Sequence, residues 1–366
     1  MGFAEYLGNE QIVKALRGML KREHVPSAVL FVGPRGVGKY TLARMFSQAL
    51  NCERSGEDFC GACESCTRIA RLADPIPLID QGLAERGESA DAGTIERVPL
   101  ILETDPDVWA IVPDPVRKRT PVARPMIRMG QLRAVQRAAF FRPEKRKRVF
   151  ILDGADTMRW TDADVFLKIL EEPPETATLV LTAQRADALL PTIRSRCLTF
   201  WFAPVPAEAI EEFLEKRTEM KKTERNLAAQ LADGCPGAAL ELDLAESARL
   251  RKEALELVSQ AADGKSYRAT FAASARLLKN ESESFENILH LFYSLLSDLL
   301  EISRGPKKFV LRNPDMRREL ETLAGKVNDG WIARATQNLD RLEGRLRRNV
   351  GRQLGLDALA VTLGVR

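Results

Sequence analysis

The stretch that decides the fold is Gly33-Pro34-Arg35-Gly36-Val37-Gly38-Lys39-Tyr40. It follows the pattern G-x-x-x-x-G-K-[ST] at every fixed position except the last, where Tyr40 replaces the hydroxyl residue. In that pattern backbone N–H groups cradle phosphates, the lysine reaches the outer phosphates, and the final hydroxyl binds Mg²⁺. The apolar run 28–32 predicts a strand before the loop, and the apolar spacing over 42–50 predicts a helix after it. We therefore interpret the stretch as a phosphate-binding loop between a strand and a helix.

Several positions around this loop lack the groups that hydrolysis requires. The ring of Tyr40 cannot place its oxygen where a short Ser or Thr side chain would, and Thr41 comes one residue late, about 100° around a helix. The strand 149–153 ends in Asp153, as a Walker B strand does, but the next residue is Gly154 where a water-orienting Glu is expected. Asp156 would have to reach back to replace that Glu. The sequence predicts a degenerate site with doubtful ATP or ADP binding and no intrinsic ATPase activity, formed by Gly33, Gly36, Gly38, Lys39, Thr41 and Asp153.

Four of the six cysteines lie close together, as Cys52, Cys60, Cys63 and Cys66. Such clustering in a cytoplasmic chain indicates thiolate ligands, and four thiolates satisfy the tetrahedral preference of structural Zn²⁺. An iron–sulfur cluster is the alternative, but its usual run continues x3-C-P, whereas Thr67 to Ala70 follow here. The remaining alternative is that the four cysteines bind no metal and have only a structural role. The other two, Cys197 and Cys235, stand alone, and we expect Cys197 to pack beside the strand that follows it.

Length and composition indicate a multidomain protein without a membrane span. The chain has 366 residues, 45% of them hydrophobic, and a formal net charge of +4. We expect no apolar run of about 18 residues and no signal peptide at the N-terminus, and hence a cytoplasmic location. The mild charge does not establish nucleic-acid binding. The basic runs 117–119 and 145–148 are interpreted as solvated loop charges, with DNA contacts as the alternative.

Together, several motifs give a resemblance to a known family. The phosphate-binding loop and the cysteine module are joined by Phe166-Leu167-Lys168-Ile169-Leu170-Glu171-Glu172-Pro173-Pro174 and by Ser195-Arg196-Cys197. The opening Leu7-Gly8-Asn9-Glu10-Gln11 and the late run Arg347-Arg348-Asn349-Val350 belong to the same pattern. Over nearly its whole length the chain resembles the bacterial clamp-loader AAA+ family. Within that family it looks like a member that has lost its own ATPase site.

The resemblance implies a role for Arg196. The sensor-1 position is Gln184, and the sensor-2 segment 234–238 has no arginine, so these departures agree with Tyr40 and Gly154. Arg196 is present in the motif by which family members reach into a neighbour's ATP site. A guanidinium supplied in trans stabilises the charge that develops on the γ-phosphate. The plain alternative is that Arg196 pairs with a local carboxylate at a strand edge.

The resemblance also implies three domains and a set of partners. We expect an α/β AAA+ P-loop domain with a parallel sheet over residues 1–203, including the zinc module at 52–66. A small helical lid over 204–243 and an all-α helical collar over 244–366 follow. We interpret the segment 81–100, which matches no motif, as a flexible loop.

The function implied is that of a non-hydrolysing subunit of the DNA polymerase III clamp loader. Such a subunit sits in a hetero-pentamer with gamma/tau and delta subunits and helps to load the sliding clamp onto primer-template DNA. An active gamma/tau-like ATPase is the first alternative. The second is a nucleic-acid-binding structural protein that uses the zinc module and basic loops directly.

Overall fold

A computed structural model describes residues 2–54, 56–87, 91–115, 125–264, 266–279, 285–305, 311–346 and 351–364. The chain forms two compact units. Unit 1 comprises Met1–Thr218 and Gly234–Leu240, and unit 2 comprises Glu219–Asp233 and Glu241–Arg366. None of the helices in the described ranges combines the length and the hydropathy of a membrane span.

Unit 1 is built on a six-stranded sheet in the order β2-β3-β4-β5-β1-β6. The strands are β1 (Ala28–Val32), β2 (Leu102–Asp105), β3 (Val108–Ile111), β4 (Arg148–Leu152), β5 (Ala177–Ala183) and β6 (Leu198–Trp201). Strands β3, β4, β5, β1 and β6 pair in parallel. The expected parallel sheet is therefore present, but the edge strand β2 pairs with β3 antiparallel, so the sheet is mixed.

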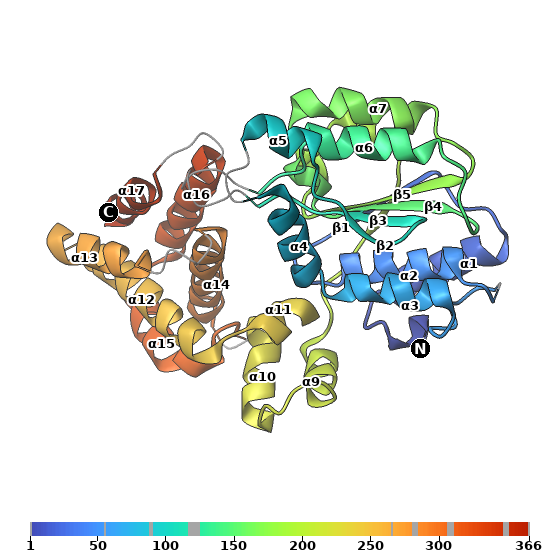
Figure 1. Ribbon diagram of the computed structural model, residues 1–366. Helices are drawn as coiled ribbons and strands as arrows, with labels where there is room; N and C mark the ends of the chain where they lie inside the picture. The colour runs from blue at the N-terminus through green and yellow to red at the C-terminus, as the bar shows by residue number, and fades with distance from the viewer. Residues whose placement is uncertain are drawn as a thin grey trace. The chain divides into compact units, whose positions relative to one another are not determined.

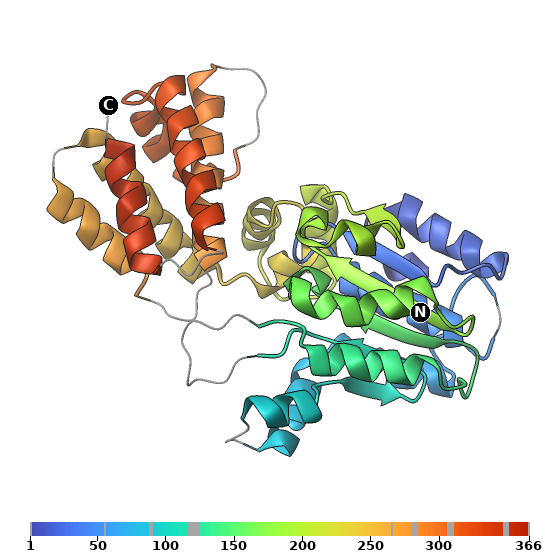
Figure 2. The same ribbon diagram turned by 90° about the horizontal axis from the view of Figure 1, so that it is seen from above.

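Helices cover both faces of this sheet (Figure 1). On one face lie α1 (Glu10–Lys21), α2 (Lys39–Asn51) and α3 (Glu64–Ala70), and on the other lie α6 (Met129–Ala139) and α7 (Ala163–Glu171). Figure 2 shows α6 and α7 side by side along the sheet. The first core lies between the sheet and α1, α2 and α3, and the second lies between the sheet and α6 and α7. Within β1, Val29 and Phe31 belong to the first core, and Leu30 and Val32 belong to the second. A strand buried on both faces is typical of a parallel sheet, and it explains the uninterrupted apolar run in the sequence.

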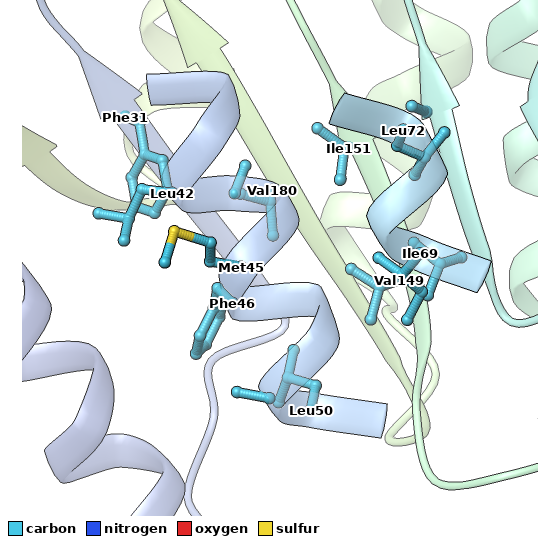
Figure 3. Packing of buried hydrophobic residues seen from close by; sticks show 14 of the residues in the cluster. Phe31, Leu42, Met45, Phe46, Leu50, Ile69, Leu72, Val149, Ile151 and Val180 are labelled. Atoms are coloured by element: carbon cyan, nitrogen blue, oxygen red, sulfur yellow. The ribbon is translucent and has the colours of Figure 1, made fainter. Parts of the chain in front are cut away.

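Helix α3, which contains the last cysteine of the module, is part of the first core. Ile69 of α3 and the nearby Leu72 lie over Val149 and Ile151 of β4, beside the side chains of α2 (Figure 3). Both Ile69 and Leu72 are fully buried. The cysteine module is therefore packed on the sheet and is not a separate small domain.

The expectation of a flexible loop over 81–100 is wrong for the described part of that segment. Residues Ile76–Arg86 form α4 and Ala92–Arg97 form α5, whose N-cap is Asp91. The cause is a long-range contact: the buried Arg86 donates Nη1 to Asp114 at 2.7 Å and Nε to the Val98 carbonyl at 2.6 Å. Removing one partner from a buried ion pair costs about 3–5 kcal/mol, so this contact holds the segment in place.

The remaining helices of unit 1 include the short α8 (Pro191–Arg194), and α9 (Ala207–Glu215), which buries Ile210 and Leu214. Unit 2 consists of α10 (Lys222–Leu231), α12 (Leu244–Asp263), α13 (Tyr267–Leu277), α14 (Phe285–Ser303), α15 (Arg317–Ala324), α16 (Asp329–Leu346) and α17 (Arg352–Gly364). As expected, the residues of α14 at helical spacing are buried in its core: Phe285, Leu289, Phe292, Leu295, Leu296 and Leu299. Helix α11 (Pro236–Glu241) belongs almost wholly to unit 1.

Candidate metal centre and nucleotide site

The phosphate-binding loop connects β1 to α2, as the motif requires. Gly38 is the N-cap of α2 and has a φ of 102°, a conformation that favours glycine. Lys39 is buried, and its Nζ donates to the carbonyl oxygens of Gly33 at 2.7 Å and of Pro34 at 2.8 Å. Burial also lowers the pKa of Lys39. The lysine is thus bound to the loop's own backbone.

The loop glycines approach other parts of the same chain. A Cβ at Gly36, whose φ is +80°, would lie 2.8 Å from the backbone nitrogen of Ala238 in α11, and the N–H of Gly237 donates to the Gly36 carbonyl at 2.8 Å. A Cβ at Gly33 would meet the side chain of Phe202 at 2.8 Å. In a working P-loop such glycines let the backbone approach phosphate. In this chain, Gly33 and Gly36 let the loop backbone approach Phe202 and Ala238.

Tyr40 takes the place of the metal-binding hydroxyl and has a different partner. Its Oη donates to the carbonyl of Leu72 at 2.9 Å, just beyond the helix of the cysteine module. Burial raises its pKa well above the ordinary tyrosine value, so the hydroxyl remains a neutral donor. Thr41 is exposed. The hydroxyl of Tyr40 therefore ties α2 to the cysteine module.

The Walker B carboxylate is held by a neighbouring strand. Thr182 of β5 donates its hydroxyl to Asp153 at 2.6 Å and accepts the N–H of Gly154 at 3.0 Å. Desolvation raises the pKa of Asp153. Asp156 accepts the N–H groups of Gln184 at 3.0 Å and Arg185 at 3.3 Å. Asp156 is thus bound to the backbone that follows β5.

The four clustered cysteines meet in space. The Sγ atoms of Cys52, Cys60, Cys63 and Cys66 all lie within 4.8 Å of one another. A tetrahedral Zn²⁺ with Zn–S bonds of about 2.3 Å needs sulfur–sulfur separations of about 3.8 Å, so small adjustments would close the shell. Cys52 follows α2, Cys63 is the N-cap of α3, and Cys66 lies within α3. These residues could hold one metal ion between two helices of the core.

Backbone dipoles around Cys60 favour a thiolate. The N–H groups of Ala62 and Cys63 point at the Cys60 Sγ, at 3.5 Å and 3.3 Å, and lower the pKa of Cys60 to about 6. Gly61, with a φ of +68°, makes this turn possible. The N–H of Cys60 in turn donates to the Cys52 Sγ at 3.3 Å. Burial raises the pKa of Cys52, which a bound cation would oppose. Burial also raises the pKa of Cys66, so the case for a metal ion rests on the convergence of the four thiols.

Arg196 lies in the connection between α8 and β6. Its Nη2 pairs with Glu171 of α7 at 2.8 Å, and its Nη1 donates to the Thr192 carbonyl at 3.0 Å. The side chains of Arg196 and Glu171 are 35% and 51% exposed. An ion pair this exposed contributes about 0–1 kcal/mol, so a stronger anion could displace Glu171.

Cys197 packs against the second core as expected, and burial raises its pKa to about 12.

Two features of the sequence cannot be placed. The basic run 117–119 and the run 347–350 lie outside the described residues. Sequence reasoning also missed two residues of the nucleotide site, namely Thr182, which holds Asp153, and Ala238, which covers the loop. The presence of the Thr182 hydroxyl in an otherwise largely apolar strand could have indicated that this side chain binds a polar group of the site.

The comparisons of sequence with known proteins agree on the DNA polymerase III subunits. The family model for the DNA polymerase III delta subunit matches residues 8–206, more than half of the chain. The Bacillus subtilis DNA polymerase III subunit delta' is 28% identical over 206 residues, covering 56% of this chain and 50% of that protein. The Mycobacterium tuberculosis subunit gamma/tau is 29% identical over 222 residues, covering 60% and 32%. The Escherichia coli subunit tau is 30% identical over 277 residues, covering 75% and 35%.

The chain therefore spans between a third and a half of the length of these relatives. Among solved structures, the Thermotoga maritima gamma subunit-related protein covers 96% of this chain and is itself covered to 98%, with a TM-score of 0.35 and 16% identity. Because this TM-score is low, the structural similarity adds nothing to the evidence from the sequence match. On the strength of the match over residues 8–206, the chain belongs to the family of the DNA polymerase III delta subunit, within the clamp-loader AAA+ proteins.

Proposed function

We propose that this chain is the delta-prime subunit of a DNA polymerase III clamp loader. In this role it hydrolyses no ATP, joins gamma/tau and delta subunits in a hetero-pentamer, and helps to load the sliding clamp onto primer-template DNA. In the three-part organisation that goes with this proposal, 1–203 is the AAA+ domain, 204–243 the lid and 244–366 the collar. Zn²⁺ at the four cysteines is part of the same proposal, as a structural ion.

The observation that carries the proposal is the engagement of the phosphate-binding loop by the chain itself. Lys39 is bound to the Gly33 and Pro34 carbonyls, Tyr40 to the Leu72 carbonyl, and the Gly36 carbonyl to the N–H of Gly237. A nucleotide would have to draw the Lys39 ammonium away from the Gly33 and Pro34 carbonyls before the lysine could bind its phosphates. Even then, neither a metal-binding hydroxyl nor a water-orienting carboxylate would be present at positions 40 and 154.

Arg196 supplies the second half of the proposal. A subunit that has lost its own site can still act on a neighbour through a guanidinium, whose planar fork matches phosphate oxygens. Arg196 is partly exposed and is held by an exchangeable pair with Glu171. That pair keeps the guanidinium ordered at the surface while leaving it free to transfer to a phosphate, which is what a finger in trans requires.

The experiment compares ATP hydrolysis by the isolated chain and by the reconstituted complex. The isolated chain should show no turnover above background. In the complex, Arg196→Ala should lower DNA-stimulated hydrolysis and clamp loading in part, because it affects only one of several ATP sites. A trans arginine in GTPases contributes roughly 10³–10⁵ in rate at its own site. Arg196→Lys should rescue poorly, since a point charge does not reproduce the fork.

Arg185→Ala is the matched control, because Arg185 is also an exposed arginine of unit 1 in an ion pair, with Asp187 at 2.6 Å. Its complex should keep the wild-type rates. An Arg196→Ala complex that assembles and loads clamps normally would make Arg196 a structural arginine. Turnover by the isolated chain at a rate typical of AAA+ ATPases would instead favour a gamma/tau-like ATPase, which the similarity to gamma/tau relatives keeps as the second candidate.

A further inference from the structure

The segment that precedes α1 contacts the phosphate-binding loop. Phe3–Glu5 form a short 3-10 helix, and the N–H of Tyr6 donates to the Phe3 carbonyl at 3.1 Å, so the position of Tyr6 is fixed relative to Phe3. The Tyr6 Oη donates to the Val37 carbonyl at 3.4 Å. A Cβ at Gly38 would lie 2.8 Å from the same oxygen. The phenol of Tyr6 therefore lies against the N-cap of α2.

The N-terminus of α2 is the end at which a phosphate would bind. In a phosphate-binding loop the backbone N–H groups at the start of the following helix point at the anion. Within the described residues, the N–H groups of Lys39 and Tyr40, the first two of α2, have no hydrogen-bond partner. The backbone at this end of the helix thus keeps donors for an anion, but the phenol of Tyr6 lies beside them.

The other end of this segment is attached to the cysteine module. The N–H of Phe3 donates to both carboxylate oxygens of Asp58, at 3.0 Å and 3.3 Å. The rings of Phe3 and Phe59 are both buried and meet edge to face, with their centroids 5.6 Å apart. Asp58 and Phe59 directly precede Cys60, one of the four clustered cysteines. The segment therefore joins the cysteine module to the phosphate-binding loop.

We propose that Phe3–Tyr6 is an autoinhibitory strap through which the state of the cysteine module controls access of a nucleoside di- or triphosphate to the loop. While the module is ordered around a metal ion, Asp58 and Phe59 hold Phe3, and Tyr6 stays at the N-terminus of α2. When the module loosens, the strap is released and the N–H groups of α2 become accessible to phosphates. Metal and nucleotide then weaken each other's binding by the same factor, because coupling between two sites is reciprocal.

This inference rests on the proposed function, since it concerns the regulation of the same degenerate loop, but it predicts binding and not hydrolysis. The test titrates the full chain with the fluorescent nucleotide mant-ADP, before and after removal of zinc by a chelator. The chelated wild type should bind mant-ADP about 5-fold more tightly or better, the lower end of the usual coupling between two sites. In the reverse experiment, ADP should weaken the retention of zinc by the same factor, measured with a chromogenic chelator.

Variants of the strap separate its release from a general loosening of unit 1. Tyr6→Ala should bind mant-ADP as tightly as the chelated wild type, and chelation should change its affinity little. Asp58→Ala, which removes the acceptor of the Phe3 N–H, should shift the affinity in the same direction. Tyr6→Phe keeps the ring and loses only the hydrogen bond to Val37, so it should behave like the wild type.

The matched control is Tyr267→Ala, which removes an exposed tyrosine of unit 2. It should keep both the weak binding of mant-ADP and its response to chelation. The zinc content of Tyr6→Ala should equal that of the wild type, so that its tighter binding comes from the strap and not from a lost metal.

Three outcomes would overturn the proposal: a chelated wild type that binds mant-ADP no better than the zinc-loaded chain, a Tyr6→Ala variant that binds no better than the wild type, or a gain on chelation that is equal in both chains. ATP turnover by the isolated chain would contradict the proposed function, but it would leave these comparisons of binding unaffected.

Discussion

At the scale of single residues, Tyr40 connects two parts of the chain that a nucleotide-binding loop leaves separate. Its ring packs against the first core of unit 1, and its hydroxyl donates to the carbonyl of Leu72, which is fully buried. A side chain at the metal-binding position has thus become part of the attachment of the cysteine module. The position has a structural role that a short hydroxyl residue could not fill.

Restoring the motif at this position should therefore cost stability without restoring activity. Tyr40→Thr removes a mostly buried ring and leaves the Leu72 carbonyl without its donor, so the free energy of unfolding should fall by about 2 kcal/mol or more. Tyr40→Phe should cost only about 1 kcal/mol, because it removes the hydroxyl alone. Chemical denaturation measures both values, and an ATPase assay of Tyr40→Thr should stay at background. A Tyr40→Thr chain as stable as the wild type would show that the bond to Leu72 contributes nothing.

At the scale of elements, the segment from Cys52 to α3 joins two helices through one set of ligands. Cys60→Ser removes the thiol whose pKa the backbone lowers most, so the variant should retain much less zinc than the wild type, which should hold about one zinc per chain. Cys197→Ser is the control, since Cys197 lies outside the cluster, and its zinc content should be unchanged. Metal analysis of protein grown without added zinc measures this. A brown, iron-bearing protein would point to the iron–sulfur alternative.

The elements that local patterns specify were predictable, and those that depend on distant partners were not. The β1 strand, the loop and α2 follow from an apolar run, a glycine pattern and helical spacing, and the four cysteines lie together as their spacing predicted. Helix α4 was missed because its anchor is the pair between Arg86 and Asp114, which are far apart in sequence. Docking of α11 on Gly36 was missed for the same reason. The roles of Arg196 and of the nucleotide-site residues stay predictions.

At the scale of the whole molecule, the two units have separate hydrophobic cores. Only unit 1 contains the cysteine cluster. Chelation of the metal should therefore lower the unfolding temperature of unit 1 and leave that of unit 2 unchanged, because metal binding contributes to the folding free energy of the unit that holds the ligands. Part of the effect should be offset by the packing of Ile69 and Leu72 on the sheet.

Tryptophan fluorescence can separate the two transitions. Trp331 is buried in unit 2, where its Nε1 donates to the Leu363 carbonyl at 2.9 Å. In a Trp331→Phe variant the remaining tryptophans belong to unit 1, so the fluorescence transition should shift with chelator. In a variant that keeps Trp331 alone, the fluorescence transition should not shift. A chelator that shifts both transitions equally would mean that the units unfold as one cooperative block.

The path of the chain between the units bears on how the protein is made. The backbone leaves unit 1 after Thr218, returns at Gly234 to place α11 on the phosphate-binding loop, and leaves again after Leu240. During synthesis, the N-terminal unit therefore cannot be completed when its last strand, β6, has emerged from the ribosome. It has to wait for about forty more residues, part of which fold into the other unit. A nascent chain that pauses in this interval would leave the loop backbone at Gly36 without the cover of α11.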